Sequence, residues 1–483
     1  MSTGYDTVVI GSGIGGLTCG AFCARAGMRV LVLEQHSKIG GYAHGFKRKD
    51  FSFESGIHSV SLAPHGLIAH LLRLLDVGSM VDIVPHEAMY AYRTPSCGFR
   101  IPQTAAEIPV ALTDAFPYEK DGIGRLLADM ERIYEAIVRP AFDFERVYKE
   151  ESRECVAAWA GRSYADYIGS FITDPRLRGV FHAMWPYGGS SPESAPMLFY
   201  AMMFAVHFRE GSHHIKGGFG TLAAALAQAI TRNDGSVRTR ACVEGLIVEN
   251  GAVRAVRLAD GEVIEARTFV SNISPYALHR TLIPGPARSK LWLRRLSALK
   301  PSFSCIGVYL GLSADITQAL DAAINFDYST DDHTALFQNI MENRLDAQDH
   351  LIYLAGEGPT GKPTLTLMRF AKIDGSADWK RDKLPLAESM VAAAEKRIPG
   401  LRDAIAVMEI GSPATFERYT GNTNGALYGF ENTKEIYGEA KVPITTYLRN
   451  LFQVGHWGRP GGGVWNVMYN GYTASKIIER TKA

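Results

Sequence analysis

Residues 7–16 read Thr7-Val-Val-Ile-Gly-Ser-Gly-Ile-Gly-Gly16, and this stretch decides the fold. Its first four residues are β-branched and are typical of a short buried strand. The glycines that follow match the pattern G-x-G-x-x-G, and residues 17–26 continue with the pattern of a helix. Residues 28–33 form a second strand that ends in Glu34, 23 residues after the first glycine. This order of elements predicts a Rossmann-like βαβ unit that binds a dinucleotide.

The glycines of this turn are predicted to have separate roles. Gly11 permits the tight turn, Gly13 lets the backbone approach a pyrophosphate, and Gly16 lets the helix pack on the strand. The N-terminus of the helix then offers N–H groups and a partial positive charge to the phosphates. Glu34 can accept hydrogen bonds from both ribose hydroxyls of an adenosine. Because its carboxylate would repel a 2′-phosphate, the tightly bound nucleotide is not expected to be NADP.

A second glycine-rich loop lies near the carboxyl end, in Phe452-Gln-Val-Gly-His-Trp-Gly-Arg-Pro-Gly-Gly-Gly-Val-Trp-Asn-Val467. It is also placed between a strand and a helix, so the chain is predicted to return to the cofactor that its first turn binds. Residues 461–463 would allow the backbone to contact a flat ring, and the helix that begins near Val464 would direct N–H groups at the edge of that ring. The alternative interpretation is a surface turn before a terminal helix.

Length and composition exclude several classes of protein. A chain of 483 residues with 46% hydrophobic and 21% charged residues is typical of a folded protein with two or three domains. The formal charge of +1 and the absence of a basic cluster give no reason to expect nucleic acid as a partner. No signal peptide is expected, because a strand begins almost at once. The most apolar stretch, residues 195–206, is too short to span a bilayer, which needs about 20 residues.

The cysteines predict neither disulfides nor a metal site. Six are scattered along the chain without a secretory signal, which favours a reducing, cytoplasmic location. Cys19 and Cys23 lie four residues apart on one helix face but lack nearby histidine or cysteine partners. They are therefore interpreted as small buried hydrophobic residues and not as metal ligands.

The rest of the chain predicts a nucleotide domain that is interrupted by insertions. Helical patterns are expected at residues 67–75, 122–138 and 164–172, and another helix ends at Ile230. Asn250-Gly251 and Asp260-Gly261 then mark hairpin turns between strands at residues 243–250, 252–258 and 263–266, and a strand at 268–272 ends the series. Further strands are expected near residues 304–312 and 351–368, and a helix at 386–396.

Two further motifs complete a resemblance to a known family. They are Gly40-Gly41-Tyr42 and Phe51-Ser-Phe-Glu-Ser-Gly-Ile-His58. With the fingerprint at the N-terminus and the loop near the C-terminus, they resemble the phytoene desaturases, carotenoid isomerases and retinol saturases, a flavoprotein group within the amine-oxidase-like superfamily. The resemblance covers both ends and residues 211–272, about half of the chain.

The resemblance implies an α/β fold in which a discontinuous, Rossmann-like FAD-binding domain of the amine-oxidase type carries an inserted mixed α+β substrate domain. The FAD-binding domain is expected at residues 1–63, 211–280 and 441–483, and the substrate-binding regions at 64–210 and 281–440. FAD would be bound non-covalently, with Val243 over the adenine and the C-terminal loop beneath the isoalloxazine. The expected FAD-binding residues are Gly11, Ser12, Gly13, Ile14, Gly15, Gly16, Glu34, Gln35, Gly40, Gly41, Val243, Gly455, His456, Gly463 and Val464.

Two departures from the family pattern lie inside the C-terminal loop. His456 stands where many relatives carry an acid that hydrogen-bonds the ribityl chain. Trp457 and Arg459 stand where desaturases tend to have small or polar residues. A bulky aromatic side chain beside the flavin would reshape the cavity, so the identity of the substrate is not carried over from the family.

The catalytic candidates are few. In the family pattern His58 lies near the substrate face of the flavin, where an imidazole can position a substrate or move a proton. The alternative is a histidine that bonds nearby backbone and orients its loop. Trp465 and Tyr469, with Asn466, are candidates for the cavity wall at the start of the last helix, whereas His213 and His214 are interpreted mainly as solvated loop residues.

The stretch from Trp185 to Phe208 is rich in methionine and aromatic residues. It is interpreted either as the wall of a tunnel for an apolar substrate, or a patch that dips into a membrane, or as an ordinary buried core helix. The long apolar substrates of the family favour the tunnel.

The expected function is that of an FAD-dependent oxidoreductase acting on C–C or C=C bonds of a hydrophobic polyene or isoprenoid-like molecule. Desaturation, saturation and isomerisation by hydride transfer at flavin N5 all fit. A reductive or cyclising enzyme of natural-product biosynthesis is the first alternative, and an amine oxidase, with Trp457 or Tyr428 in an aromatic cage, is another. An alternative of a different class is a non-catalytic escort protein that binds prenyl groups.

The expected partners follow from this function. They are a lipophilic small molecule, with peripheral membrane contact as a possibility, and no nucleic acid. No second dinucleotide motif is present, so electrons would pass to O2 or a quinone, or NAD(P)H would bind transiently as a donor. The sequence does not indicate the oligomeric state.

Overall fold

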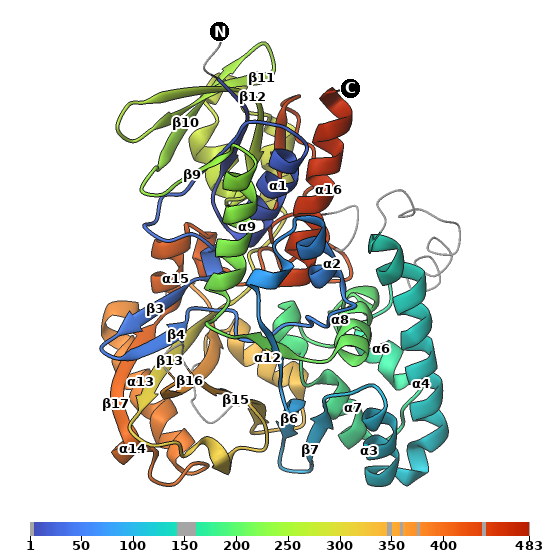
Figure 1. Ribbon diagram of the computed structural model, residues 1–483. Helices are drawn as coiled ribbons and strands as arrows, with labels where there is room; N and C mark the ends of the chain where they lie inside the picture. Colours follow the sequence, from blue (N-terminus) through green and yellow to red (C-terminus); the bar gives the residue numbers. More distant parts are fainter. Residues whose placement is uncertain are drawn as a thin grey trace.

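The computed structural model describes residues 4–142, 161–344, 350–357, 361–373, 377–436 and 441–482. Two sheets dominate it, one in the upper and one in the lower half of Figure 1. The upper sheet has the strand order β10-β11-β12-β1-β2-β9, and β18 pairs with β12. Its strands are β1 (Tyr5–Ile10), β2 (Val30–Leu33), β9 (Ser236–Arg238), β10 (Val243–Glu249), β11 (Ala252–Leu258), β12 (Val263–Ser271) and β18 (Leu451–Gln453).

This sheet confirms the predicted return of the chain from a meander to a parallel strand. β10, β11 and the first half of β12 are antiparallel, whereas the second half of β12 is parallel to β1 on one side and to β18 on the other. The strands expected at residues 263–266 and 268–272 are therefore one continuous strand. The backbone stays extended because β1 and β18 take over the hydrogen bonding where β11 ends.

Three helices pack on this sheet, and two of them, from opposite ends of the chain, contact each other. They are α1 (Ile14–Arg25), α9 (Gly220–Arg232) and α16 (Val464–Lys482). α1 begins at Ile14, earlier than the expected start at residue 17, because the turn is already complete at Gly13, which has an extended backbone. The helices α1 and α16 approach so closely that a Cβ at Gly471 would overlap the backbone oxygen of Gly15.

The lower sheet combines strands from both predicted substrate regions. Its order is β17-β13-β16-β15-β14-β6-β7. The strands are β6 (Ala88–Arg93), β7 (Gly98–Pro102), β13 (Ser304–Leu312), β14 (Ile324–Tyr328), β15 (His350–Glu357), β16 (Pro363–Ala371) and β17 (Ile405–Gly411). Every residue of β13 is buried, as expected for a central strand between covered faces. The domain boundaries stated above remain a prediction.

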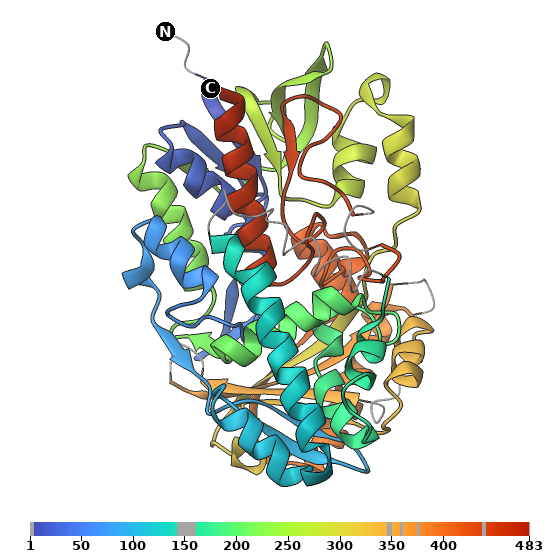
Figure 2. The ribbon, with the colours of Figure 1, turned by 90° about the vertical axis from the view of Figure 1, so that its right-hand side faces the viewer.

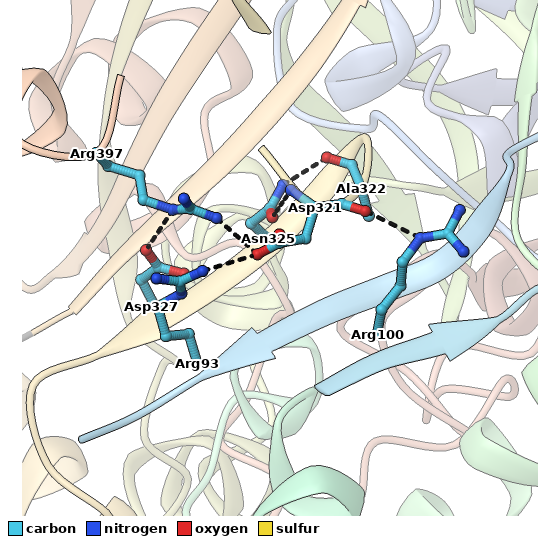
Figure 3. A network of polar contacts seen from close by, with 7 residues as sticks. All are labelled: Arg93, Arg100, Asp321, Ala322, Asn325, Asp327 and Arg397. Atoms are coloured by element: carbon cyan, nitrogen blue, oxygen red, sulfur yellow. Dashed lines mark hydrogen bonds and ion pairs between the residues drawn. The ribbon is translucent and has the colours of Figure 1, made fainter. Parts of the chain in front are cut away.

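A network of ion pairs fastens β6 and β7 to the rest of this sheet (Figure 3). The carboxylate of Asp321 accepts hydrogen bonds from Arg93 of β6 at 3.1 Å and from Arg397 at 2.6 Å, while its backbone oxygen accepts one from Arg100 of β7 at 2.9 Å. Arg397 also lies 3.9 Å from the carboxylate of Asp327, whose pKa burial raises to about 6. Segments more than 200 residues apart in sequence are thus joined at one sheet edge.

Helices cover the face of the molecule that is turned toward the viewer in Figure 2, where α4 runs along the front. The helices of this region are α2 (Leu67–Leu74), α3 (Glu107–Ala115), α4 (Lys120–Ile133), α6 (Tyr164–Gly169), α7 (Pro175–His182) and α8 (Met197–Glu210). The helix expected to run to residue 138 changes to a π-helical turn at Tyr134–Val138. The remaining helices and short strands are α10 (Pro275–Ala277), α11 (Lys290–Ser297), α12 (His333–Met341), α13 (Trp379–Glu395), α14 (Leu401–Ala404), α15 (Pro413–Thr420), β3 (Gly45–Arg48), β4 (Phe51–Glu54), β5 (Ile83–Pro85) and β8 (His213–Ile215).

Two local expectations are corrected by these elements. His213 and His214 do not lie in a solvated loop but form β8, which is antiparallel to β5, and His213 is 7% exposed. The helix expected at residues 386–396 begins earlier, at Trp379, because the Asp378 side chain caps it by accepting a hydrogen bond from the Lys380 N–H.

Candidate functional site

A cavity of about 430 Å3 extends from the nucleotide sheet to the helices that carry the aromatic and methionine residues. Its wall includes the carboxyl ends of β1 and β2, the turn before α1, and residues that follow β12 and β18. Ligands of open α/β sheets bind outside the carboxyl ends of the strands.

Thirteen of the predicted cofactor residues line this cavity. They are Gly11, Gly13, Ile14, Gly15, Glu34, Gln35, Gly40, Gly41, Val243, Gly455, His456, Gly463 and Val464. Ser12 and Gly16 do not line the cavity, but each contacts a residue that does. The Ser12 side chain binds Glu34, whereas a Cβ at Gly16 would overlap the Gly11 backbone oxygen, so Gly16 serves helix packing as its predicted role required.

Glu34 is held in place by three hydrogen bonds. Its Oε2 accepts from the Ser12 N–H at 2.9 Å and from the Ser12 hydroxyl at 2.6 Å, and its Oε1 accepts from the His36 N–H at 2.8 Å. Only 8% of the residue is exposed. A carboxylate that is fixed at the end of β2 can accept the hydroxyls of a ribose without an entropic cost for ordering its side chain.

Two orphaned polar atoms on the cavity wall fit a large polar ligand. The Asn272 Oδ1 and the Trp465 Nε1 are buried, and neither has a hydrogen-bond partner among the residues that the structure describes. Both residues line the cavity. Leaving a buried polar group without a partner costs about 1–3 kcal/mol, so a bound molecule that pairs with them would be stabilised. The residues present therefore fit the expected dinucleotide.

The C-terminal loop contributes its glycines and His456 but not Trp457. Trp457 is 1% exposed, its ring packs edge-on against Tyr276 and Phe430, and its Nε1–H donates to the Asn422 Oδ1 at 2.8 Å. The expectation that this ring reshapes the cavity is wrong, because the loop turns it into a separate apolar cluster. An aromatic cage that includes Trp457 is excluded for the same reason. Arg459, the other departure from the family pattern, also lies outside the cavity wall.

His456 is half-buried, and each of its ring nitrogens lies beside an oxygen that can only accept a hydrogen bond. Its Nδ1 lies 3.2 Å from the Leu427 backbone oxygen and its Nε2 lies 3.2 Å from the Asn422 Oδ1. Burial lowers the pKa of the imidazole to about 4.

The wall of the cavity also includes an apolar face of α8. α8 contributes Phe199, Met202, Met203 and Val206, whose spacing of three and four residues places them on one helix face. Other residues of the same helix, such as Phe204, are buried in the core. The stretch from Trp185 to Phe208 thus contributes both to the cavity wall and to the core, on different faces of α8.

The start of α16 forms part of the same wall. Val464, Trp465, Asn466 and Val467 line the cavity. Tyr469 does not, because its ring lies against Trp465, with 5.7 Å between the ring centroids, and packs into the core beside the nucleotide sheet. The expectation that Tyr469 is catalytic is therefore not supported by its position.

His58 lies on the cavity wall beside a tyrosine that the sequence did not indicate. Its Nε2 is 2.6 Å from the Tyr187 hydroxyl, and its Nδ1 is 3.2 Å from the Gly56 backbone oxygen. A carbonyl can only accept, so the Nδ1–H donates to Gly56 and Nε2 accepts from Tyr187. Burial lowers the pKa of His58 to about 4, which keeps it neutral at physiological pH.

Several residues of the wall were missed by the sequence analysis, namely Tyr187, Asn272 and Asn422. For Asn272 a signal was available, because it directly follows β12, whose carboxyl end lies beside that of β1. The others lie in loops and turns that no local pattern connects with the cofactor.

Within the described ranges, no group of histidine, cysteine and acidic residues is arranged to hold a metal ion. Cys19 and Cys23 are fully buried in α1, as expected, whereas Cys155 lies outside the described residues. Among the described helices, none combines the length and apolarity that crossing a membrane requires.

The chain is similar to several known proteins. The chain is 26% identical to the prolycopene isomerase of Daucus carota, over 97% of this chain and 78% of the relative. It is 24% identical to the 4,4'-diapophytoene desaturase of Methylomonas sp, over 99% of this chain and 96% of the relative. An oxidoreductase from Methanosarcina mazei has the same fold, with a TM-score of 0.65 and 17% identity over 98% of this chain and 100% of that structure.

A family model supplies the assignment. The model described as flavin containing amine oxidoreductase matches residues 14–323, which is more than half of the chain and includes α1, Glu34, His58 and the meander. The chain therefore belongs to the family of flavin containing amine oxidoreductases and is an FAD-dependent oxidoreductase.

Proposed function

We propose that this enzyme acts on a C–C or C=C bond of a hydrophobic polyene or isoprenoid-like molecule, by desaturation, saturation or isomerisation. The observation that carries the proposal is the division of one cavity into two halves. One half is built from glycine backbone and Glu34, and the other from apolar side chains of α8. A large apolar wall with few polar groups suits an uncharged lipophilic substrate.

FAD would be held by the first half of the cavity. The turn at Gly11, Gly13 and Gly15 would receive the pyrophosphate at the N-terminus of α1, and Glu34 would receive the ribose. The loop that ends at Gly463 would lie along the isoalloxazine. When bound, FAD supplies a two-electron acceptor and donor at its N5 atom.

The chain's own residues would bind the substrate and exclude water. Phe199, Met202, Met203 and Val206 present an apolar surface, and flexible methionine side chains adapt to an irregular hydrocarbon. The N-terminus of α16 would stabilise negative charge on the reduced cofactor, because its N–H groups have no partner within the helix. Charge that develops beside such fixed dipoles costs little reorganisation.

The similar proteins support the same substrate class. The names of two of them, prolycopene isomerase and diapophytoene desaturase, describe reactions at carbon–carbon double bonds. They match nearly the whole of this chain.

The test is turnover of polyenes by purified holoenzyme under anaerobic conditions. Phytoene, lycopene isomers and all-trans-retinol are offered separately to the oxidised and to the chemically reduced flavoprotein, and the products are separated by chromatography. Loss of the flavin absorbance near 450 nm with a new double bond indicates desaturation. A new isomer, or a saturated product from the reduced enzyme, indicates the other two reactions.

One substitution tests substrate binding separately from FAD binding. Val206→Trp fills the apolar half, so we expect it to retain bound FAD and to lose at least tenfold in the rate of polyene turnover. A yellow wild-type enzyme that leaves every polyene unchanged in both redox states, but oxidises an amine such as putrescine, would overturn the proposal.

A further inference from the structure

We propose that Tyr187, paired with His58, is the residue that exchanges a proton with the substrate. This inference rests on the proposed function, because a substrate that loses or gains a hydride in that reaction also loses or gains a proton. The two side chains lie 129 residues apart in sequence and meet at one place on the cavity wall.

The pair is fixed from both sides. The rings of His58 and Tyr187 have centroids 5.5 Å apart, and Tyr187 also packs edge-on against Phe326 of β14, with 5.2 Å between centroids. Tyr187 lies in the turn Trp185–Gly188. This turn is held to a distant segment of the same chain, because the Asn432 side chain donates to the Gly188 backbone oxygen at 2.6 Å. A proton donor or acceptor that is held in this way needs no rearrangement before it reacts.

The direction of the hydrogen bond decides what each group can do. Because the Nδ1–H of His58 is directed at the Gly56 carbonyl, its Nε2 accepts the proton of the Tyr187 hydroxyl. The phenol oxygen keeps a free lone pair, so it can take a proton from a substrate while it passes its own proton to His58. The same two steps in reverse deliver a proton to the substrate.

Atoms and electrons balance in this scheme. In a desaturation, one C–H bond of the substrate would break and its electron pair would leave as a hydride, for which bound FAD would supply the two-electron acceptor. The neighbouring C–H bond then breaks and its electron pair forms the new C=C bond. The proton goes to the Tyr187 oxygen, and the former hydroxyl proton goes to the His58 Nε2. Saturation reverses each step.

A weak base is sufficient for this task. Loss of a hydride from a conjugated hydrocarbon leaves a delocalised cation, and a C–H bond next to such a cation is strongly acidic. Burial lowers the pKa of His58 to about 4 and raises that of Tyr187. An imidazolium in this place is a strong acid, which returns its proton readily when a polyene must be protonated. The other titratable groups near the pair are His86, Tyr328 and Tyr428.

The test compares Tyr187→Phe with His58→Gln and a matched control. Tyr328→Phe is the control, because Tyr328 is a buried tyrosine that donates to the Ala183 backbone oxygen at 2.7 Å and lies outside the cavity wall. We expect Tyr187→Phe and His58→Gln each to lower the rate of polyene turnover by about 10²- to 10⁴-fold. Bound FAD and its midpoint potential should stay unchanged, and Tyr328→Phe should retain the wild-type rate.

A second readout does not depend on turnover. In protein with ¹⁵N-labelled histidine, the Nε2 resonance of His58, assigned by its disappearance in His58→Gln, should shift in Tyr187→Phe and not in Tyr328→Phe. An active wild-type enzyme whose Tyr187→Phe variant is equally active, or a His58 resonance that does not move, would overturn the inference alone. A wild-type enzyme that converts no polyene would overturn the proposed function and the inference with it.

Discussion

Gly15 in α1 and Gly455 in the C-terminal loop leave no room for a side chain between them, although they stand at opposite ends of the chain. A Cβ at Gly15 would lie 2.9 Å from the Gly455 Cα and 3.0 Å from its backbone nitrogen. The two glycine-rich loops thus form one wall of the cavity. The predictions below test this wall, the groups fixed on it, and the apolar half opposite.

Gly455→Ala is expected to weaken FAD binding by at least tenfold. Gly455 has a φ of +88°, and a Cβ there would overlap the Asn272 side chain. Gly400→Ala is the matched control, because Gly400 has a φ of +84° but nothing within 4 Å of its Cβ position. Both variants carry the same backbone strain, about 1–3 kcal/mol, so a loss of FAD affinity, measured by fluorescence titration, should appear only at position 455.

Glu34→Gln is expected to lower FAD affinity by about 10- to 100-fold, because hydrogen bonds to a charged group contribute about 1.5–3 kcal/mol. An amide in this place also directs an N–H₂ group at donors of Ser12 or His36, which bind the carboxylate in the wild type. Equilibrium dialysis of FAD against the apoprotein measures the change. Glu262→Gln, on an exposed carboxylate, should bind FAD as the wild type does, and equal affinities of both variants would contradict the assignment of Glu34.

Glu54→Gln is expected to change how stability depends on pH. Burial raises the pKa of Glu54 from 4.5 to about 7, although its Oε1 accepts a hydrogen bond from the Phe219 N–H. The folded protein therefore holds a proton that the unfolded chain releases above pH 4.5, and the stability from this group is lost as the pH rises through 7.

Glutamine cannot ionise, so the free energy of unfolding of Glu54→Gln should increase relative to the wild type by up to about 3 kcal/mol between pH 4.5 and pH 8. Urea denaturation at both pH values provides the measurement. Glu87→Gln, at a side chain that is 97% exposed, should show no such trend. A constant difference across the pH range would show that Glu54 is ionised in the folded protein.

Met203→Ala is expected to change substrate preference toward bulkier polyenes. Met203 lines the apolar half of the cavity, whereas Met390 is fully buried in a separate core cluster. Met390→Ala should cost about 2–5 kcal/mol of stability and leave the relative kcat/KM values of a polyene series unchanged. Met203→Ala should alter those ratios, and identical ratios in the two variants would place the substrate elsewhere.

Much of the nucleotide half followed from local sequence patterns. The β-branched run and the glycine turn predicted β1 and α1, and the Asn250-Gly251 turn predicted the hairpin of β10 and β11. These patterns succeed because backbone conformation at a glycine turn, and hydrogen bonding between strands joined by a tight turn, are decided within a few residues. Their main error was to predict two strands where the structure has the single strand β12. The hydrogen-bonding partners of β12 change along its length.

The substrate-binding half was harder to predict from the sequence. The spacing of Phe199, Met202, Met203 and Val206 is that of any helix with an apolar face, and sequence alone does not distinguish a core from a cavity wall. Trp457 shows the reverse error, because a residue within a functional loop turns its side chain into the core.

By itself the sequence determined the nucleotide fold, the family and FAD as the cofactor, since each depends on short glycine, strand and hairpin signals that act locally. Only the tertiary structure decided that Tyr187 meets His58, that the Asn272 Oδ1 and the Trp465 Nε1 have no hydrogen-bond partner among the described residues, and that Trp457 packs in a separate apolar cluster. Such contacts depend on how segments more than a hundred residues apart pack against each other, and packing is settled by the whole set of buried side chains together.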